Sequence, residues 1–253
     1  ANATVYNMTG PARIEIPRKS AHGAVGWVAE TDGRPETNSP TFANITLEAF
    51  ELYGNAAATQ TILDSVAGAE QMLLEDLSGS LWEELNSAFC TGDGSGKPTG
   101  IWSDAGIAAY VTSLSGSQNA IDAAAIFNGM FALSTRYQPN AKWYMKPATL
   151  AVVAQVPYPN SVARSMVDWN GDAATILGKE VVLVDDAPAI GDGAYPIAYG
   201  DLKAAYGVGI HRDISVLRDP FSNKPYVQFY STARVGGVPL DPAALVLVKS
   251  DPA

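Results

Sequence analysis

A glycine-rich run between residues 91 and 100 has a superficial similarity to a phosphate-binding loop. A phosphate loop needs glycine at its first position, Ser or Thr after its lysine, and a helix that begins at its end, because backbone N–H groups must point at the phosphates. Here Thr91 stands at the first position, Pro98 follows Lys97, and the run comes after a helical pattern rather than a strand. Nucleotide binding is therefore not expected.

Acidic side chains form two groups that could do chemistry. Four glutamates share one helical segment: Glu70, Glu75, Glu83 and Glu84. Glycosidases use such carboxylates in pairs, but on a long helix they more simply form a solvated or interfacial face. The run Asp168–Asp172 resembles a calcium loop weakly, because its ligand spacing is incomplete and no downstream glutamate stands in place.

The remaining candidates are single residues. His22 and His211 each stand alone, without a second ligand at metal-binding spacing. Cys90 is the one cysteine, which excludes an intrachain disulfide and a multi-thiolate zinc site; its place after an apolar helical run predicts a small buried or half-buried residue. The sequence thus predicts no catalytic, cofactor-binding or metal-ligating residue, and a structural or binding protein rather than an enzyme.

The charge balance narrows the class of partner. The 253 residues include 16 Lys and Arg against 26 Asp and Glu, a formal net charge of -10. Because basic residues are few and scattered, sequence-specific DNA binding is not expected. An acidic surface repels DNA, which suits a container for packed DNA. The sequence shows neither an apolar run of the roughly 18 residues that span a membrane nor a signal peptide.

The first 48 residues predict elements that need another surface. Residues 1–23 are expected to form an extended arm, because Pro11 and Pro17 interrupt any helix while Ile14 and Ile16 alternate with charged residues. Such an arm needs a neighbour to hold it. Residues 24–48 are expected to form a long hairpin around a polar, turn-rich stretch. A lone hairpin is marginal in water, so another subunit or the rest of the domain is expected to cover it.

Residues 62–89 predict the strongest helix, because apolar residues recur there at alternating spacings of three and four. The helix would span roughly 40 Å, and Gly68 and Gly79 could bend it. The glycine run at 91–100 then ends it.

The rest of the chain predicts a mixed α/β unit followed by a β-rich segment. In residues 101–205, a helix is expected at 121–133, strands at 143–145 and 181–184, a helix after Pro147, and a loop at 156–172. After residue 205, long strands are expected around a turn at 219–225, with a buried strand at 245–248. In the strand expected at 226–235, Val227, Phe229 and Ser231 are expected to face away from their neighbours Gln228, Tyr230 and Thr232.

The order of these parts resembles the Hong Kong 97 capsid fold of tailed phages and gene transfer agents, an α+β fold with an N-arm, an extended loop (E-loop), a long spine helix and an α/β axial domain. Two groups of motifs carry the resemblance. The first is Gly26-Trp27-Val28-Ala29-Glu30 with Arg34-Pro35-Glu36-Thr37 and Pro40-Thr41-Phe42, which is similar to the family's E-loop. The second is Leu63-Asp64-Ser65 leading into a helix that ends at Phe89, then Gly92-Asp93-Gly94 and Lys97-Pro98-Thr99-Gly100-Ile101.

The resemblance implies a division of the chain: N-arm 1–23, E-loop 24–48, peripheral (P) domain 49–105 and 206–238, and axial (A) domain 106–205 and 239–253. It implies a major capsid protein that forms pentamers and hexamers, encloses DNA without reading its sequence, and assembles in the bacterial cytoplasm with a portal and decoration proteins. No membrane and no cofactor are implied. Ala1 would then be a candidate product of maturation cleavage.

Inter-subunit contacts are expected at Ile14, Ile16, Trp27, Val28, Arg34, Glu36 and Phe42. Some family members crosslink their subunits through an E-loop lysine, an asparagine and a catalytic glutamate. Here Thr31 stands at the lysine position, and the strand after Asn223 holds no glutamate, so no isopeptide crosslink is expected. The alternatives are an encapsulin-like protein compartment, a binding module and a hydrolase that uses acidic residues.

Overall fold

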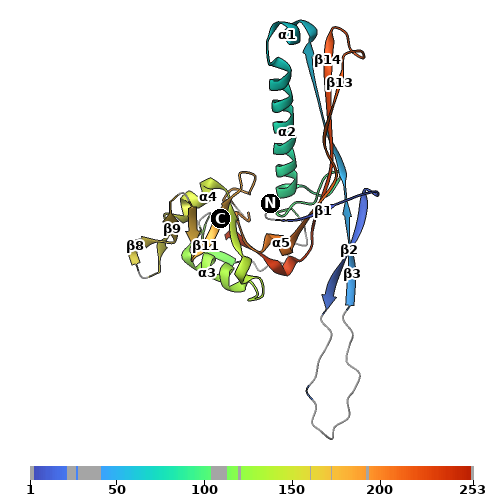
Figure 1. Cartoon of the computed structure of the whole chain (residues 1–253). Helices are drawn as coiled ribbons and strands as arrows, with labels where there is room; N and C mark the ends of the chain where they lie inside the picture. The colour runs from blue at the N-terminus through green and yellow to red at the C-terminus, as the bar shows by residue number, and fades with distance from the viewer. Residues whose placement is uncertain are drawn as a thin grey trace.

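The computed structural model describes residues 3–21, 27, 41–103, 113–118, 121–159, 161–171, 173–191 and 194–251. These residues form three parts (Figure 1): a tall two-layer part made of a long helix and long strands, a globular part beside its foot, and a two-stranded hairpin that projects from the foot. We call the first two parts the blade and the globular region. Mixed helix and strand content confirms the predicted α+β class.

The blade is a four-stranded sheet covered on one face by helices. Its strand order is β1-β13-β14-β4, with β1 parallel to β13 and the other pairs antiparallel. The strands are β1 (Thr4–Asn7), β13 (Tyr206–Asp219), β14 (Tyr226–Pro239) and β4 (Phe50–Thr59), and the helices are α1 (Gln60–Ser65) and α2 (Ala69–Thr91). Val227, Phe229 and Ser231 of β14 are buried and Tyr230 is exposed, which confirms the predicted alternation.

The predicted helix at 62–89 is two helices. α1 ends at Ser65, the next residue Val66 is extended, and α2 starts after Gly68, whose φ of 84° belongs to the left-handed region. Glycine adopts this conformation without steric cost, so the chain turns here instead of continuing. The predicted apolar stripe is buried only at the inner end of α2, at Leu81, Leu85 and Ala88.

The N-terminal segment pairs with its own chain, contrary to the expectation that it needs a neighbour. β1 pairs with β13, and β2 (Arg13–Ala21) pairs antiparallel with β3 (Thr41–Glu48). The hairpin strands therefore begin at Arg13 rather than near residue 24. Pro17 lies opposite Asn44 inside β2, which is tolerated because each strand of a two-stranded ladder is an edge strand.

The globular region is built on a seven-stranded mixed sheet with the order β5-β15-β12-β6-β11-β10-β9. Its strands are β5 (Ser113–Gln118), β15 (Leu245–Asp251), β12 (Ile197–Gly200), β6 (Lys142–Met145), β11 (Lys179–Leu183), β10 (Ala173–Ile176) and β9 (Val167–Asn170). Its helices are α3 (Ala123–Ala132), α4 (Pro147–Val153) and α5 (Leu202–Ala205), with short 3-10 turns η2 (Gln138–Asn140) and η3 (Pro242–Ala244).

Both faces of this sheet are buried at its central strands β6, β12 and β15. On β6, β12 and β15, alternate residues enter two different clusters: Trp143 packs with α3 and α4, while Tyr144 and Leu247 pack with Ile101 and Trp102 on the other face. The predicted helices at 121–133 and after Pro147 and the buried strand at 245–248 are confirmed. The predicted loop at 156–172 instead contains β7 (Pro157–Tyr158), β8 (Ser161–Ser165) and β9, and Leu183 of the strand predicted at 181–184 is exposed.

Glycines allow the strands to cross where the blade meets the hairpin. A Cβ on Gly209 would lie 2.7 Å from Met8 Sδ and 2.8 Å from Leu47 Cδ2, and one on Gly236 would lie 2.1 Å from the Glu48 carbonyl oxygen. The Tyr206 hydroxyl donates to the Thr99 carbonyl at 2.6 Å. None of the helices that the structure describes is both long and apolar enough to cross a membrane.

Candidate subunit interfaces

The glycine run forms a tight reversal at the foot of α2. Asp93 and Thr99 pair as an isolated bridge, the Ser95 N–H donates to Asp93 Oδ1 at 3.0 Å, and Lys97 Nζ lies 3.9 Å from the same oxygen. The described residues after the run, 101–103, form a turn. The lysine therefore pairs with an aspartate of its own turn, and the run does not lead into a helix N-terminus that could hold a phosphate.

Several of the acidic residues considered for catalysis or calcium binding instead make contacts within the fold. Glu70 pairs with Arg218 of β13 at 3.2 Å, and Glu75 accepts from the Gln71 side chain at 3.0 Å. Asp168 lies in the β9–β10 hairpin, where its carbonyl accepts from the Thr175 hydroxyl, and Asp172 lies outside the described residues. Within the part of the chain that the structure describes, no group of three or more His, Cys, Asp or Glu is placed to hold a metal ion.

Cys90 is buried, whereas His211 is half-buried and contacts its own chain. Burial, and to a smaller extent the charge of Asp186, raises the pKa of the Cys90 thiol to about 12, so the thiol stays neutral at physiological pH and is a poor nucleophile. His211 Nε2 lies 3.0 Å from the Gly10 carbonyl oxygen, between β13 and the link from β1 to β2. His22 lies outside the described residues.

The residues predicted to contact neighbouring subunits differ in how far their own chain covers them. Ile14 and Ile16 are half-buried and pair with Leu47 and Ile45 of β3, so part of their surface is covered within the same chain. Trp27 is fully exposed. The remaining predicted contact residues lie outside the described part of the chain: Val28, Arg34, Glu36 and the side chain of Phe42.

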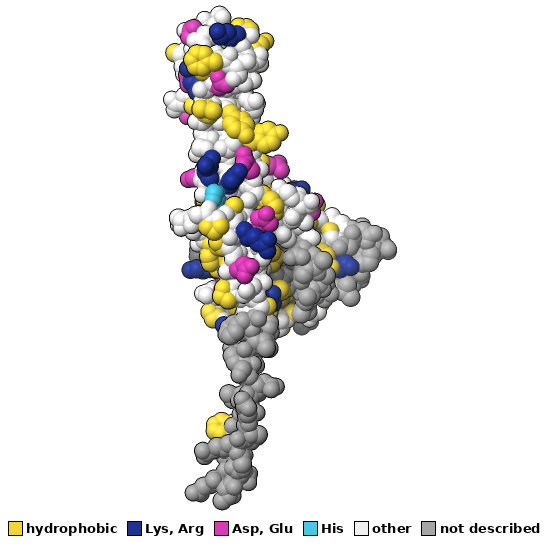
Figure 2. All heavy atoms as spheres, turned by 90° about the vertical axis from the view of Figure 1, so that its right-hand side faces the viewer, with side chains coloured by type: hydrophobic (Ala, Val, Ile, Leu, Met, Phe, Trp, Pro, Cys, Tyr) yellow, Lys and Arg dark blue, Asp and Glu magenta, His cyan; other side chains and the backbone are white. Residues whose placement is uncertain are grey.

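An apolar surface on the blade was missed by the sequence analysis. Tyr53 and Leu217 are 67% and 63% exposed, and both flank Tyr230 on the sheet face that points away from α2. The rings of Tyr53 and Tyr230 are 6.3 Å apart. Figure 2 views this side of the blade, where apolar side chains gather on its outer half. Strand alternation in the sequence could have indicated this surface, because these residues alternate along their strands with the residues that face α2 and therefore lie on the other face of the sheet.

Other large apolar side chains are exposed around the tip of the blade. They are Ile62, Val66, Met72, Phe221 and Tyr226. An exposed apolar patch of this extent typically marks an interaction site. Towards the foot, Arg234 Nε donates to Glu51 Oε2 at 2.8 Å across β14 and β4. The outer face of the blade therefore combines an apolar outer half with a charged inner half.

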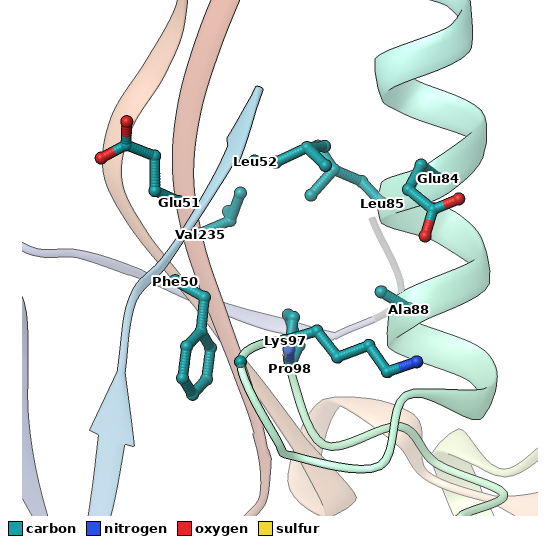
Figure 3. A pocket seen from close by; sticks show the side chains of 10 residues that line it. Phe50, Glu51, Leu52, Glu84, Leu85, Ala88, Lys97, Pro98 and Val235 are labelled. Carbon is teal, nitrogen blue, oxygen red and sulfur yellow. The ribbon is translucent and has the colours of Figure 1, made fainter. Parts of the chain in front are cut away.

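A small hollow opens between β4 and α2 (Figure 3). Apolar side chains of Leu52, Leu85 and Ala88 line it, with Glu84 and Lys97 beside them. Its volume of about 50 Å³ holds a few methyl groups but is far below the several hundred Å³ of typical substrate sites. The hollow is suited to one side chain of a partner.

Comparison with known proteins identifies the family. A model described as the phage capsid family matches residues 2–250. The chain is 29% identical to the capsid of a native GTA particle, with a TM-score of 0.88, covering 99% of this chain and 88% of that one. The capsid of an empty GTA particle is 30% identical, with a TM-score of 0.85 and the same coverage of both chains.

A structure from Mycobacterium phage Adephagia shares the fold, with a TM-score of 0.70 at 15% identity, covering 100% of this chain and 89% of that one. No curated protein matches the chain. The family match over nearly the whole length and the likeness to capsid structures lead to one conclusion: the chain belongs to the phage capsid family and is a major capsid protein that forms a shell.

Proposed function

We propose that copies of this chain assemble as pentamers and hexamers into a closed particle that encloses DNA, as the head of a tailed phage or the shell of a gene transfer agent. The observation that carries the proposal is the blade, whose sheet has one face covered by helices and an apolar opposite face left open. A permanent assembly buries such surface between subunits. The identity of 29–30% to capsids of GTA particles favours the gene transfer agent.

We also propose that the parts of this structure correspond to the domains of the capsid fold. Apart from β1, which belongs to the N-arm, the blade corresponds to the P domain at 49–105 and 206–238, and the globular region to the A domain at 106–205 and 239–253. The N-arm at 1–23 and the E-loop at 24–48 would reach neighbouring subunits with Ile14, Ile16, Trp27, Val28, Arg34, Glu36 and Phe42. The full exposure of Trp27 supports this role, because a buried Trp is a frequent anchor of binding energy.

The charge of the chain fits a container that does not hold its DNA tightly. With a net charge of -10, the chain offers few cations to neutralise phosphates, so binding would be independent of sequence. A portal and decoration proteins would complete the particle, which would assemble in the bacterial cytoplasm. Stability would come from non-covalent contacts alone, without enzymatic activity. A crosslinked ladder on a denaturing gel of purified particles would contradict this.

Negative-stain electron microscopy of the purified chain, over a range of protein and salt concentrations, tests the proposal. Closed shells or rings of five and six subunits are expected. Nuclease treatment of particles from the native host adds the test for cargo, where protected DNA is expected and protected protein cargo alone would point to a protein compartment. Removal of residues 24–48 is expected to abolish closed shells, and normal shells from that variant would contradict the role of the E-loop.

A further inference from the structure

The outer half of the blade sheet ends in two strand edges that differ in character. β1 covers β13 only from Gly207 to Ile210, so the rest of β13 has an open edge, and β4 is the last strand on the opposite side. No further strand pairs with either edge among the residues that the structure describes. An open edge presents unpaired N–H and C=O groups, which a further strand can use.

The β13 edge is protected against pairing. Its register against β14 is irregular between Ile210 and Arg212 and again between Arg212 and Ser215. Charged side chains occupy the same stretch: Arg212, Asp213, Arg218 and Asp219. Bulges and charges are two of the devices by which proteins keep edge strands from pairing with other chains.

The β4 edge lacks these protections. β4 pairs with β14 in an unbroken register from Phe50 to Thr59, and none of its residues is fully buried. From Leu52 to Thr59 the strand contains neither a charged residue nor proline. Every second residue of an antiparallel edge strand directs its N–H and C=O away from its partner, so about half of β4 offers free backbone groups.

The small hollow lies beside the inner end of this edge. Phe50 and Leu52 of β4 line it together with Leu85 and Ala88 of α2 (Figure 3). In strand addition, backbone hydrogen bonds give affinity, and pockets for alternate side chains give specificity. The β4 edge and the hollow of about 50 Å³ provide both, and the volume suits a small aliphatic side chain.

We propose that, in the shell, an extended segment of a second copy of this chain hydrogen-bonds along β4 and adds a fifth strand to the blade sheet. The inference rests on the proposed shell function. A second copy is favoured over a different protein as the source of this strand, because a shell holds many copies of the chain at fixed geometry. The β4 edge also carries no charge from Leu52 to Thr59 that could select a charged partner. Each copy also carries extended chain in β2 and β3, which projects away from its own blade (Figure 1).

Hydrogen exchange followed by mass spectrometry tests the proposal on shells assembled from the purified chain. In shells, the outward-facing amides of Glu51–Thr59 are expected to exchange about a hundredfold or more slowly than in free subunits, while amides of Asp213–Arg218 on the protected edge change little. Unchanged exchange in β4 overturns the proposal. Protection that appears only when another protein is added overturns the second copy as occupant. Shells without β4 protection leave the proposed function standing, whereas a complete absence of shells contradicts both.

A pair of matched variants provides a second readout. Ala57→Lys places a charge on the β4 edge, and Gln228→Lys places the same charge directly opposite, one strand further in. Both lysines lie on the exposed face of the blade, but only the one at position 57 also lies on the edge, where charge opposes pairing. Ala57→Lys is therefore expected to lower shell yield by about tenfold or more relative to Gln228→Lys. Circular dichroism of both subunits verifies folding. Equal yields from the two folded variants would contradict a role for the edge.

Discussion

The globular region and the blade are both sheets with helices, but they differ in how their faces are covered. In the globular region, alternate residues of β6, β12 and β15 enter separate clusters on the two faces of the sheet. In the blade, α2 covers one face over a small cluster around Leu85, Ala233 and Val235, and the opposite face carries exposed Tyr53, Tyr230 and Leu217. The globular region thus stabilises itself, whereas the blade has the surface of a layer that neighbouring subunits complete.

The largest expected effect on the free subunit is in the globular region. Trp143 is fully buried, its ring centroid lies 4.3 Å from that of Tyr199, and its Nε1 donates to the Ile176 carbonyl at 3.1 Å. Trp143→Ala is expected to lower the free energy of unfolding by about 3–5 kcal/mol, measured by chemical denaturation. A loss below about 1 kcal/mol would mean that this region is not the self-sufficient core.

The apolar face of the blade is expected to respond in the opposite way. Replacing Tyr53 and Leu217 with serine should change subunit stability by no more than about 1 kcal/mol, because these side chains are 67% and 63% exposed. Assembly should require about tenfold or more protein, since buried aromatic residues are frequent interface anchors. Light scattering against concentration measures this, with Gln228→Ser on the same face as control. Unaltered assembly would exclude this face from the shell contacts.

Gly209, where the blade meets the hairpin, is expected to show a smaller effect. Gly209→Val introduces side-chain atoms against Met8 and Leu47, which are both buried. Overpacking should lower the free energy of unfolding by about 1–3 kcal/mol and speed hydrogen exchange in β1. Stability equal to that of the unaltered chain would show that β1 and the hairpin can shift without cost.

The smallest expected effect is a stabilisation. A Cβ on Gly79 of α2 would meet nothing within 4 Å, and alanine is favoured over glycine inside a helix by about 1 kcal/mol. Gly79→Ala should therefore raise the free energy of unfolding by about that amount. If the variant folds normally but fails to form shells, the glycine serves close approach of a neighbour to α2.

The sequence could predict the features that depend on local periodicity. Alternation located the buried face of β14, a continuous apolar run located the strand at 245–248, and helical spacing located the helix α3, because each pattern reports directly on which faces are buried. Gly68 and Gly79 were both named as possible bends, and the break lies at Gly68. Periodicity could not distinguish the two positions, since a left-handed glycine and a helical glycine leave the same apolar spacing around them. The partner of β2 was also missed, because pairing of Arg13 with Glu48 is set by chain path rather than by neighbouring residues.

The candidate interfaces were only partly predictable. Trp27 was predicted to contact a neighbouring subunit; its full exposure is compatible with that contact, which stays a prediction. The apolar face of the blade was not predicted, because Tyr53 and Leu217 look like ordinary strand residues until the sheet shows which face the helices leave open.

A reconstruction of the assembled shell at side-chain resolution tests the central claim most directly. The account predicts that each chain keeps the fold described above, and that Tyr53, Leu217, Tyr230 and Met72 of the blade become buried against neighbouring subunits. A closed shell in which these side chains remain in solvent, held together by the globular regions alone, would contradict it.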